Sequence, residues 1–198
     1  MTRFFLVTAA MLVVTLIGGC ASSPQAKFYT LSAGQPREPV QMVRPITINI
    51  DAVIVPQMVD RPQFVLRVDP TEVRIDEFAR WADPLKSQIA RVLAADLTQS
   101  MPGALVSSYP RPGADETQGV YHLWVDVQSF ESVPGDGASI VVMWSVQPPK
   151  RAAAVTGRTV VHEAAGADGN DALVDAHSRA LATVGNDIAS AIRPMLGP

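Results

Sequence analysis

Cys20 is the only cysteine in this chain of 198 residues, and it follows an apolar run near the N-terminus. Arg3 precedes that run, which extends over residues 4–17, and Gly18 and Gly19 separate it from the cysteine. A positive charge, a short apolar stretch and small residues in this order are typical of a signal segment that a peptidase removes. Because one cysteine cannot form an internal disulfide, the rest of the chain must be stabilised by packing alone.

The segment Ile17-Gly18-Gly19-Cys20 resembles the lipobox of bacterial lipoproteins. That resemblance implies cleavage before Cys20 and a tether of acyl chains on the new N-terminus. Two alternatives stay open, a transmembrane anchor and an ordinary secretory signal, but the apolar run is shorter than the ~20 residues that span a bilayer. Ala21 stands where an aspartate would signal inner-membrane retention, so the resemblance favours the outer membrane, with the protein facing the periplasm.

The chain divides into three predicted parts: a signal peptide over 1–19, a lipidated linker over 20–44 with a short strand at 27–31, and one domain over 45–198. The domain is long enough to bury a sizeable core. Removing Arg3 with the signal peptide changes the formal net charge from -3 to -4. This mildly acidic balance, without a basic block, argues against a nucleic-acid partner.

Apolar periodicity predicts the order β-β-β-α-β-β-β-β-α within the domain. The predicted strands cover 46–54, 63–68, 73–75, 104–107, 121–131, 140–146 and 157–163. We expect Asp83 to be the N-cap of the first helix, and Asn170 or Asp171 that of the second. The strand 140–146 is almost entirely apolar, which predicts a central position with both faces covered. Two helices with hairpins and crossovers indicate a single mixed α/β domain.

Sequence motifs give no sign of catalysis: the chain has no phosphate-binding loop, dinucleotide fingerprint or Gly-x-Ser-x-Gly elbow. We therefore predict no enzymatic activity and no cofactor. His122 and His162 lie on strands that could be neighbours, but two solvent-facing histidines are a simpler interpretation than a metal site. The acidic run 168–171 fits a helix-capping turn better than a calcium loop. Trp124 and Trp144 are interpreted as packing residues rather than a ligand cage.

The segment Asp60-Arg61-Pro62-Gln63 follows an apolar strand and the Pro56 break, which places it on a tight connection. One interpretation is a plain turn in which Arg61 pairs with Asp60 or another nearby carboxylate. The other is a corner that faces a protein partner, since arginine is enriched at interface anchor points. The sequence leaves both open.

Four segments in order resemble the ABC-type transport auxiliary lipoproteins, which include the paraquat-inducible-protein-C-like proteins. They are Phe28-Tyr29-Thr30-Leu31, the strand ending at Pro56 with Asp60-Arg61-Pro62-Gln63, Arg80-Trp81-Ala82-Asp83-Pro84-Leu85, and the hairpin over 121–146. Val59 and Asp83 depart from the family pattern, which has an aromatic residue or leucine and a glutamate there.

The resemblance implies a three-layer α/β domain with a mixed, roughly five-stranded sheet, similar to the anticodon-binding-domain fold and the N-terminal domain of TolB. It implies partners among ABC transporter subunits and mammalian-cell-entry (MCE) domain proteins, in lipid transport between the two membranes, and in some members a homo-oligomeric ring. Arg61 and Trp81 are then the predicted docking residues. Two other functions stay open: a periplasmic lipid- or small-molecule-binding lipoprotein, and a structural lipoprotein of envelope assembly.

Overall fold

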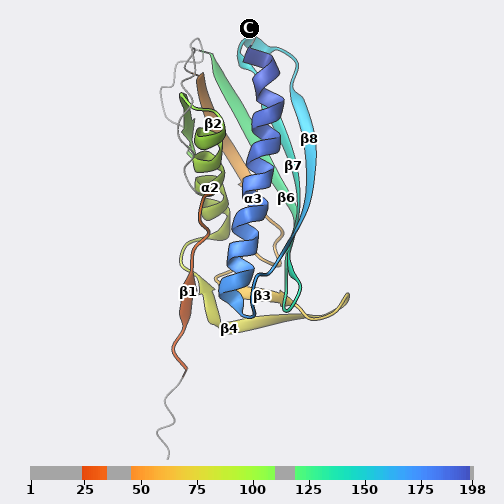
Figure 1. Cartoon of the computed structure of the whole chain (residues 1–198). Coiled ribbons are helices and arrows are strands. Elements are labelled where there is room, and N and C mark those ends of the chain that lie inside the picture. The colour runs from red at the N-terminus through yellow and green to blue at the C-terminus, as the bar shows by residue number, and fades with distance from the viewer. Residues whose placement is uncertain (1–23, 35–45, 110–118, 197–198) are drawn as a thin grey trace, which may run out of the picture.

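A computed structural model describes residues 24–34, 46–109 and 119–196 (Figure 1). The predicted signal peptide and Cys20 lie outside these residues, as does most of the predicted linker. The elements are β1 (Lys27–Tyr29), β2 (Ile46–Ile54), β3 (Gln63–Arg67), β4 (Val73–Trp81), α2 (Leu85–Ser100), β5 (Ala104–Ser107), β6 (Val120–Val133), β7 (Gly137–Gln147), η2 (Pro149–Arg151), β8 (Val155–Ala164), α3 (Asn170–Ile192) and η3 (Arg193–Leu196).

A five-stranded sheet has the order β5-β2-β6-β7-β8. β2 runs parallel to both β5 and β6, whereas β6, β7 and β8 pair antiparallel. The central strand is therefore β6. The prediction of a central, doubly covered strand at 140–146 was wrong: β7 lies one position out, and Met143 on its open face is 42% exposed. The prediction failed because the outward-facing residues of β7 are apolar as well. A continuous apolar run does not require that both faces of a strand are covered by other elements.

Both helices lie against the same face of this sheet, α2 over β2 and β5 and α3 over β7 and β8 (Figure 1). The predicted apolar faces are buried, including Leu93 in α2 and Leu181 in α3. The mixed α/β class, the five-stranded sheet and the two main helices are thus confirmed. Of the layers that the resemblance implied, the helices and this sheet form two, and a smaller sheet closes one end.

The smaller sheet has the order β1-β4-β3, with β1 parallel to β4 and β3 antiparallel to it. β4 extends to Trp81, six residues beyond its predicted end. The pairing moves from Phe64↔Asp76 to Gln63↔Arg80, which leaves a bulge in β4. One oxygen of the Asp76 carboxylate accepts the backbone N–H groups of Phe78 and Ala79 there, at 3.0 and 3.1 Å. The bulge breaks the alternation, so the second half of β4 had no clear pattern.

Both predicted helix caps were wrong. The N-cap of α2 is Pro84 and that of α3 is Gly169, and neither makes a side-chain cap hydrogen bond. The Asp83 carboxylate instead accepts from the Arg91 guanidinium at 3.0 Å. Asn170 donates to the Asp76 carboxylate of β4 at 3.1 Å, so it fastens α3 to the small sheet.

The chain after β1 is held between the two helices by side chains of both. The N–H of Leu31 donates to the buried Gln88 amide of α2 at 2.8 Å, and that of Ser32 to the Ser178 hydroxyl of α3 at 3.2 Å. Gly34 donates its N–H to the Asp96 carboxylate at 2.9 Å. We call residues 30–34 the strap, because it ties the N-terminal segment to both helices.

A glycine on β8 accommodates a tryptophan of β7. Gly157 pairs with Trp144, and a Cβ atom at this position would overlap the indole ring. The ring cannot move away freely, because its N–H donates to the Thr159 hydroxyl, which in turn donates to Asp187 of α3. The glycine is therefore required by packing.

We expect Gly157→Ala to lower the free energy of unfolding by about 1–3 kcal/mol, as overpacked cores do. Gly166→Ala is the matched control, since no atom of the described ranges lies within 4 Å of the added methyl group. The control should keep or slightly raise stability by restricting the unfolded chain. Urea denaturation of both variants measures the difference in the free energy of unfolding. Equal stabilities would show that the Trp144 indole can shift to make room for the methyl group without loss of stability.

Candidate functional site

The connection from β2 to β3 forms one wall of the predicted corner. The carbonyl of Pro56 accepts the N–H groups of Val59 and Asp60, and the carbonyl of Val59 accepts that of Arg61. Val59 is buried, so it anchors the loop to the core while Asp60, Arg61 and Pro62 are exposed. These contacts hold the three residues at the surface in a defined turn.

The opposite wall is the connection from β4 to α2. The N–H of Trp81 donates to the Pro62 carbonyl at 2.7 Å and joins the two walls. The N–H of Ala82 donates to the Tyr29 carbonyl at 2.9 Å, which joins this wall to β1. Two segments far apart in sequence are thus fixed beside each other and beside the N-terminal strand.

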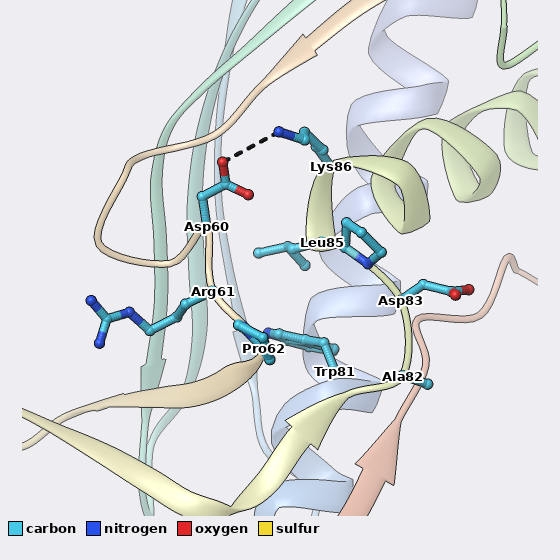
Figure 2. Close-up of a pocket in the computed structure, with 9 residues that line it drawn as sticks. Asp60, Arg61, Pro62, Trp81, Ala82, Asp83, Leu85 and Lys86 are labelled. Atoms are coloured by element: carbon cyan, nitrogen blue, oxygen red, sulfur yellow. Dashed lines mark hydrogen bonds and ion pairs between the residues drawn. The ribbon is translucent and has the colours of Figure 1, made fainter.

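A pocket of about 440 Å³ opens between these walls. Figure 2 shows Pro62, Trp81 and Leu85 along its apolar floor. Two ion pairs lie on its rim, Lys86 with Asp60 at 3.4 Å and Arg91 with Asp83 at 3.0 Å. We call this the corner pocket. Its lining residues are Asp60, Arg61, Pro62, Trp81, Ala82, Asp83, Pro84, Leu85 and Lys86.

Among the charged residues that line the pocket, Arg61 has no ionic partner within the described residues. Its side chain points away from the pocket floor into solvent (Figure 2), and it makes no ion pair with any residue in the described part of the chain. The interpretation in which Arg61 pairs with Asp60 or a nearby carboxylate was therefore wrong, since Asp60 pairs with Lys86. A guanidinium left free in this way is available to a carboxylate or phosphate from outside.

Trp81 is buried, with only 6% of its surface exposed. Its ring lies 4.8 Å from that of Phe64 and 6.2 Å from that of Phe130, so it belongs to an aromatic cluster in the core. The indole therefore forms part of the pocket floor while most of its surface packs into the core. Gln63 is not among the residues that line the pocket, and its amide donates to the Glu77 carboxylate at 3.3 Å.

The sequence predicted binding residues on both walls of this pocket, the exposed turn on one wall and a single residue on the other. It found Asp60, Arg61, Pro62 and Trp81, but it assigned no binding role to Leu85 or Lys86. Leu85 ends the segment over 80–85 that carries the family resemblance, and Lys86 follows it in the first turn of α2. Their short distance from Trp81 in the sequence was the signal that could have identified them as pocket residues.

His177 lies in the middle of the core, stacked on Phe130 with ring centroids 3.7 Å apart. Its Nε2 is 2.8 Å from the Ser132 hydroxyl, while its Nδ1 has no hydrogen-bond partner among the residues that the structure describes. Complete burial lowers the pKa of the imidazole to about 3, so it is neutral in the folded protein. Although serine and histidine are in contact, both are buried and no substrate can reach the pair.

The possible two-histidine metal site is contradicted by the sheet order. β7 separates β6 from β8, and His122 pairs with Gln147 whereas His162 pairs with Ser139, near opposite ends of β7. His122 instead contacts the Asp51 carboxylate at 2.8 Å. Within the described residues, no group of three or more metal-binding side chains occurs, the acidic run 168–171 included.

The two tryptophans of the long hairpin differ in exposure. Trp144 is buried against Gly157, as a packing residue would be. Trp124 is 41% exposed on the open face of the sheet and stacks on His122.

No helix in the described ranges is both long and apolar enough to cross a membrane.

Solved structures share this fold at low sequence identity. An uncharacterised protein matches with a TM-score of 0.68 at 20% identity, over 85% of this chain and 99% of that one. Protein XCC0632 from Xanthomonas campestris, described as DUF330, matches with a TM-score of 0.61 at 16% identity, over 84% of this chain and 94% of that one. No curated protein matches the sequence.

The family comparison covers most of the molecule. The model of the ABC-type transport auxiliary lipoprotein component family matches residues 29–189. This range begins in β1, contains both walls of the corner pocket and ends in α3. The chain therefore belongs to the ABC-type transport auxiliary lipoprotein family.

Proposed function

We propose that this protein is a non-enzymatic, lipid-anchored subunit of an ABC/MCE-type intermembrane lipid-transport system. The Cys20 acyl chains anchor it in the outer membrane, and the corner pocket docks a protein of the transport machinery in the periplasm. Family membership supports the transport role. The observation that carries the docking assignment is the free Arg61 guanidinium beside a pocket whose other lining charges are paired.

The pocket's chemistry defines the partner segment that fits it. Arg61 suits a carboxylate of the partner, since arginine binds this group through two parallel hydrogen bonds. The floor of Pro62, Trp81 and Leu85 suits one apolar side chain beside that carboxylate. We therefore expect an MCE-domain protein or an ABC subunit to present an acidic residue next to an apolar one.

The contacts around β1 support a docking role close to the membrane. Ala82 of the pocket lining is hydrogen-bonded to Tyr29, and Tyr29 lies nine residues after Cys20. An acylated Cys20 would thus hold the corner pocket near the bilayer. A partner that bridges the periplasm could then meet it there without a long flexible connection.

A gentle detergent pull-down of the full-length protein tests this function. We expect an MCE-domain protein or ABC subunits to co-purify, as identified by mass spectrometry. Intact protein that is acylated but recovered alone would contradict the transport role. Native mass spectrometry of the same sample would reveal a bound lipid if the protein itself is a lipid-binding module.

Replacing Arg61 should weaken docking without weakening the fold. Because its side chain is exposed and unpaired, we expect Arg61→Ala to change the free energy of unfolding by less than about 0.5 kcal/mol. Loss of the charge at an interface anchor should lower partner affinity about tenfold or more. Affinity is measured by titrating the co-purified partner.

The matched control is Arg158→Ala, which removes an exposed arginine from β8, at the far edge of the five-stranded sheet from β5. The control should bind like the unmodified protein. Equal affinity of the Arg61 and Arg158 variants would remove the corner pocket from the docking site.

A further inference from the structure

We propose that Phe28 of β1 and Phe78 of β4 contact the phospholipid bilayer that holds the Cys20 acyl chains. This inference rests on the lipid anchor of the proposed function. It assigns a membrane-facing surface to the small sheet, which the anchor alone does not require. We call Phe28, Phe78, Lys27 and Arg80 the aromatic edge.

The two phenylalanines are unusually exposed for residues on paired strands. Phe28 is 66% exposed, the highest value among the large apolar side chains of the described residues, and Phe78 is 48% exposed. Phe28 is the register partner of Arg80, so Phe78 lies two positions away on the neighbouring strand. By contrast, Tyr29 and Trp81, one pair further along the same two strands, are buried. Two exposed phenylalanines at neighbouring positions of one sheet favour an apolar partner.

The length of chain between anchor and sheet limits how far this edge can be from the bilayer. Lys27 lies only seven positions after Cys20. At ~3.3–3.6 Å per residue, a fully extended segment of that length spans at most about 25 Å. Figure 1 shows that the described chain begins at the end of the molecule where β3 and β4 lie. The tether therefore keeps the aromatic edge at a high effective concentration near lipid.

Two cations lie next to Phe28, Arg80 across the strand pair on the same face and Lys27 along β1 on the opposite face. Lys27 precedes Phe28, and Arg80 is its register partner on β4. Neither makes an ion pair within the described part of the chain; the Arg80 guanidinium donates only to the Glu77 carbonyl, at 3.2 Å. Long basic side chains can reach phosphate groups while neighbouring aromatic rings enter the interface. The exposed rings and the two cations thus match a phospholipid headgroup region, while the carboxylates of Asp76 and Asp171 line a hollow together with Lys27 and Phe78.

The single cysteine makes a site-specific test possible. Since acylation consumes the Cys20 thiol, Ala26→Cys supplies the one free thiol of the full-length protein next to the aromatic edge, and an environment-sensitive fluorophore can be attached at this exposed position. The protein is reconstituted in vesicles of phosphatidylethanolamine and phosphatidylglycerol that contain a nitroxide-labelled phospholipid. Quenching of the fluorophore then reports contact of the edge with lipid.

The decisive comparison leaves the tether unchanged. We expect Phe28→Ser with Phe78→Ser to reduce quenching by about half or more, because burial of two aromatic side chains shifts the contact equilibrium at least ~tenfold. The control pair, Leu105→Ser with Val160→Ser, removes side chains of similar exposure (65% and 60%) from strands of the other sheet. The fluorophore on the control pair should be quenched as strongly as on the labelled protein without serine substitutions.

Equal quenching in the serine pair and the control pair would overturn the proposal, since the edge would then be near lipid through its tether alone. The same result would follow if these rings contacted a protein, because the vesicles contain no partner. Failure of the anchor itself is distinguished beforehand: mass spectrometry would show Cys20 without acyl chains, and the fluorophore would label two thiols.

Discussion

Trp81→Ala should lower the free energy of unfolding by about 3–5 kcal/mol, as truncation of a buried aromatic side chain does. The indole contacts Phe64 and Phe130, and it lies where β4, the pocket floor and the end of β6 meet. Its removal leaves a cavity between the small sheet and the main core. Chemical denaturation of the purified protein measures the loss, and partner titration below the unfolding transition measures docking separately.

Trp124→Ala provides the matched control, because that tryptophan is 41% exposed on the open face of the sheet. We expect the control to cost less than half as much. If Trp81→Ala keeps its stability and loses only partner affinity, the indole is an interface anchor and not the support of the pocket floor. That outcome would reverse the assignment made from its burial.

Acidification should destabilise the protein through His177. The pKa of this imidazole is about 3 in the folded state and about 6.5 when unfolded, because burial disfavours its charged form. Between these values the unfolded chain binds the extra proton, so stability falls as the pH falls from 6.5 towards 3. The slope reaches about 1.4 kcal/mol per pH unit, which gives a loss of roughly 2 kcal/mol at about pH 5.

The variant His177→Gln isolates this effect, since glutamine can still meet the Ser132 hydroxyl but does not titrate in this range. Its free energy of unfolding should be lower than that of the unmodified protein at pH 7, and the gap should narrow on acidification. Asp96 acts in the opposite direction, because burial raises its carboxyl pKa, but it is present in both proteins and cancels. Parallel pH profiles would show that His177 does not control acid stability.

Regular periodicity made most of the fold predictable, and irregular backbone limited the rest. The alternation in β6 and the apolar faces of α2 and α3 fixed both the elements and the residues that they bury. The second half of β4 was missed because a bulge around Asp76 interrupts its alternation. The cap predictions failed because Asp83 and Asn170 bind more distant side chains rather than the adjacent backbone.

The candidate site was only partly predictable because it depends on pairing between distant segments. Residue type and a family resemblance selected Arg61 and Trp81, but only the structure separates their roles, one exposed and one buried. The burial of His177 had a signal in the sequence: it lies four residues after Leu173 and four before Leu181, on the apolar face of the last helix. The helical spacing of His177 from these two leucines, rather than its residue type, indicated that it is buried.

The strap has a mechanical consequence for a protein held at one end by a membrane. Tension applied at the N-terminus would act along β1, parallel to β4, and would load their hydrogen bonds and those to Gln88, Ser178 and Asp96 in shear. Bonds loaded in this way resist together instead of opening one by one. A pull from a docked transporter against the lipid anchor would therefore be carried into both helices, and the domain could bear load without unravelling from its tethered end.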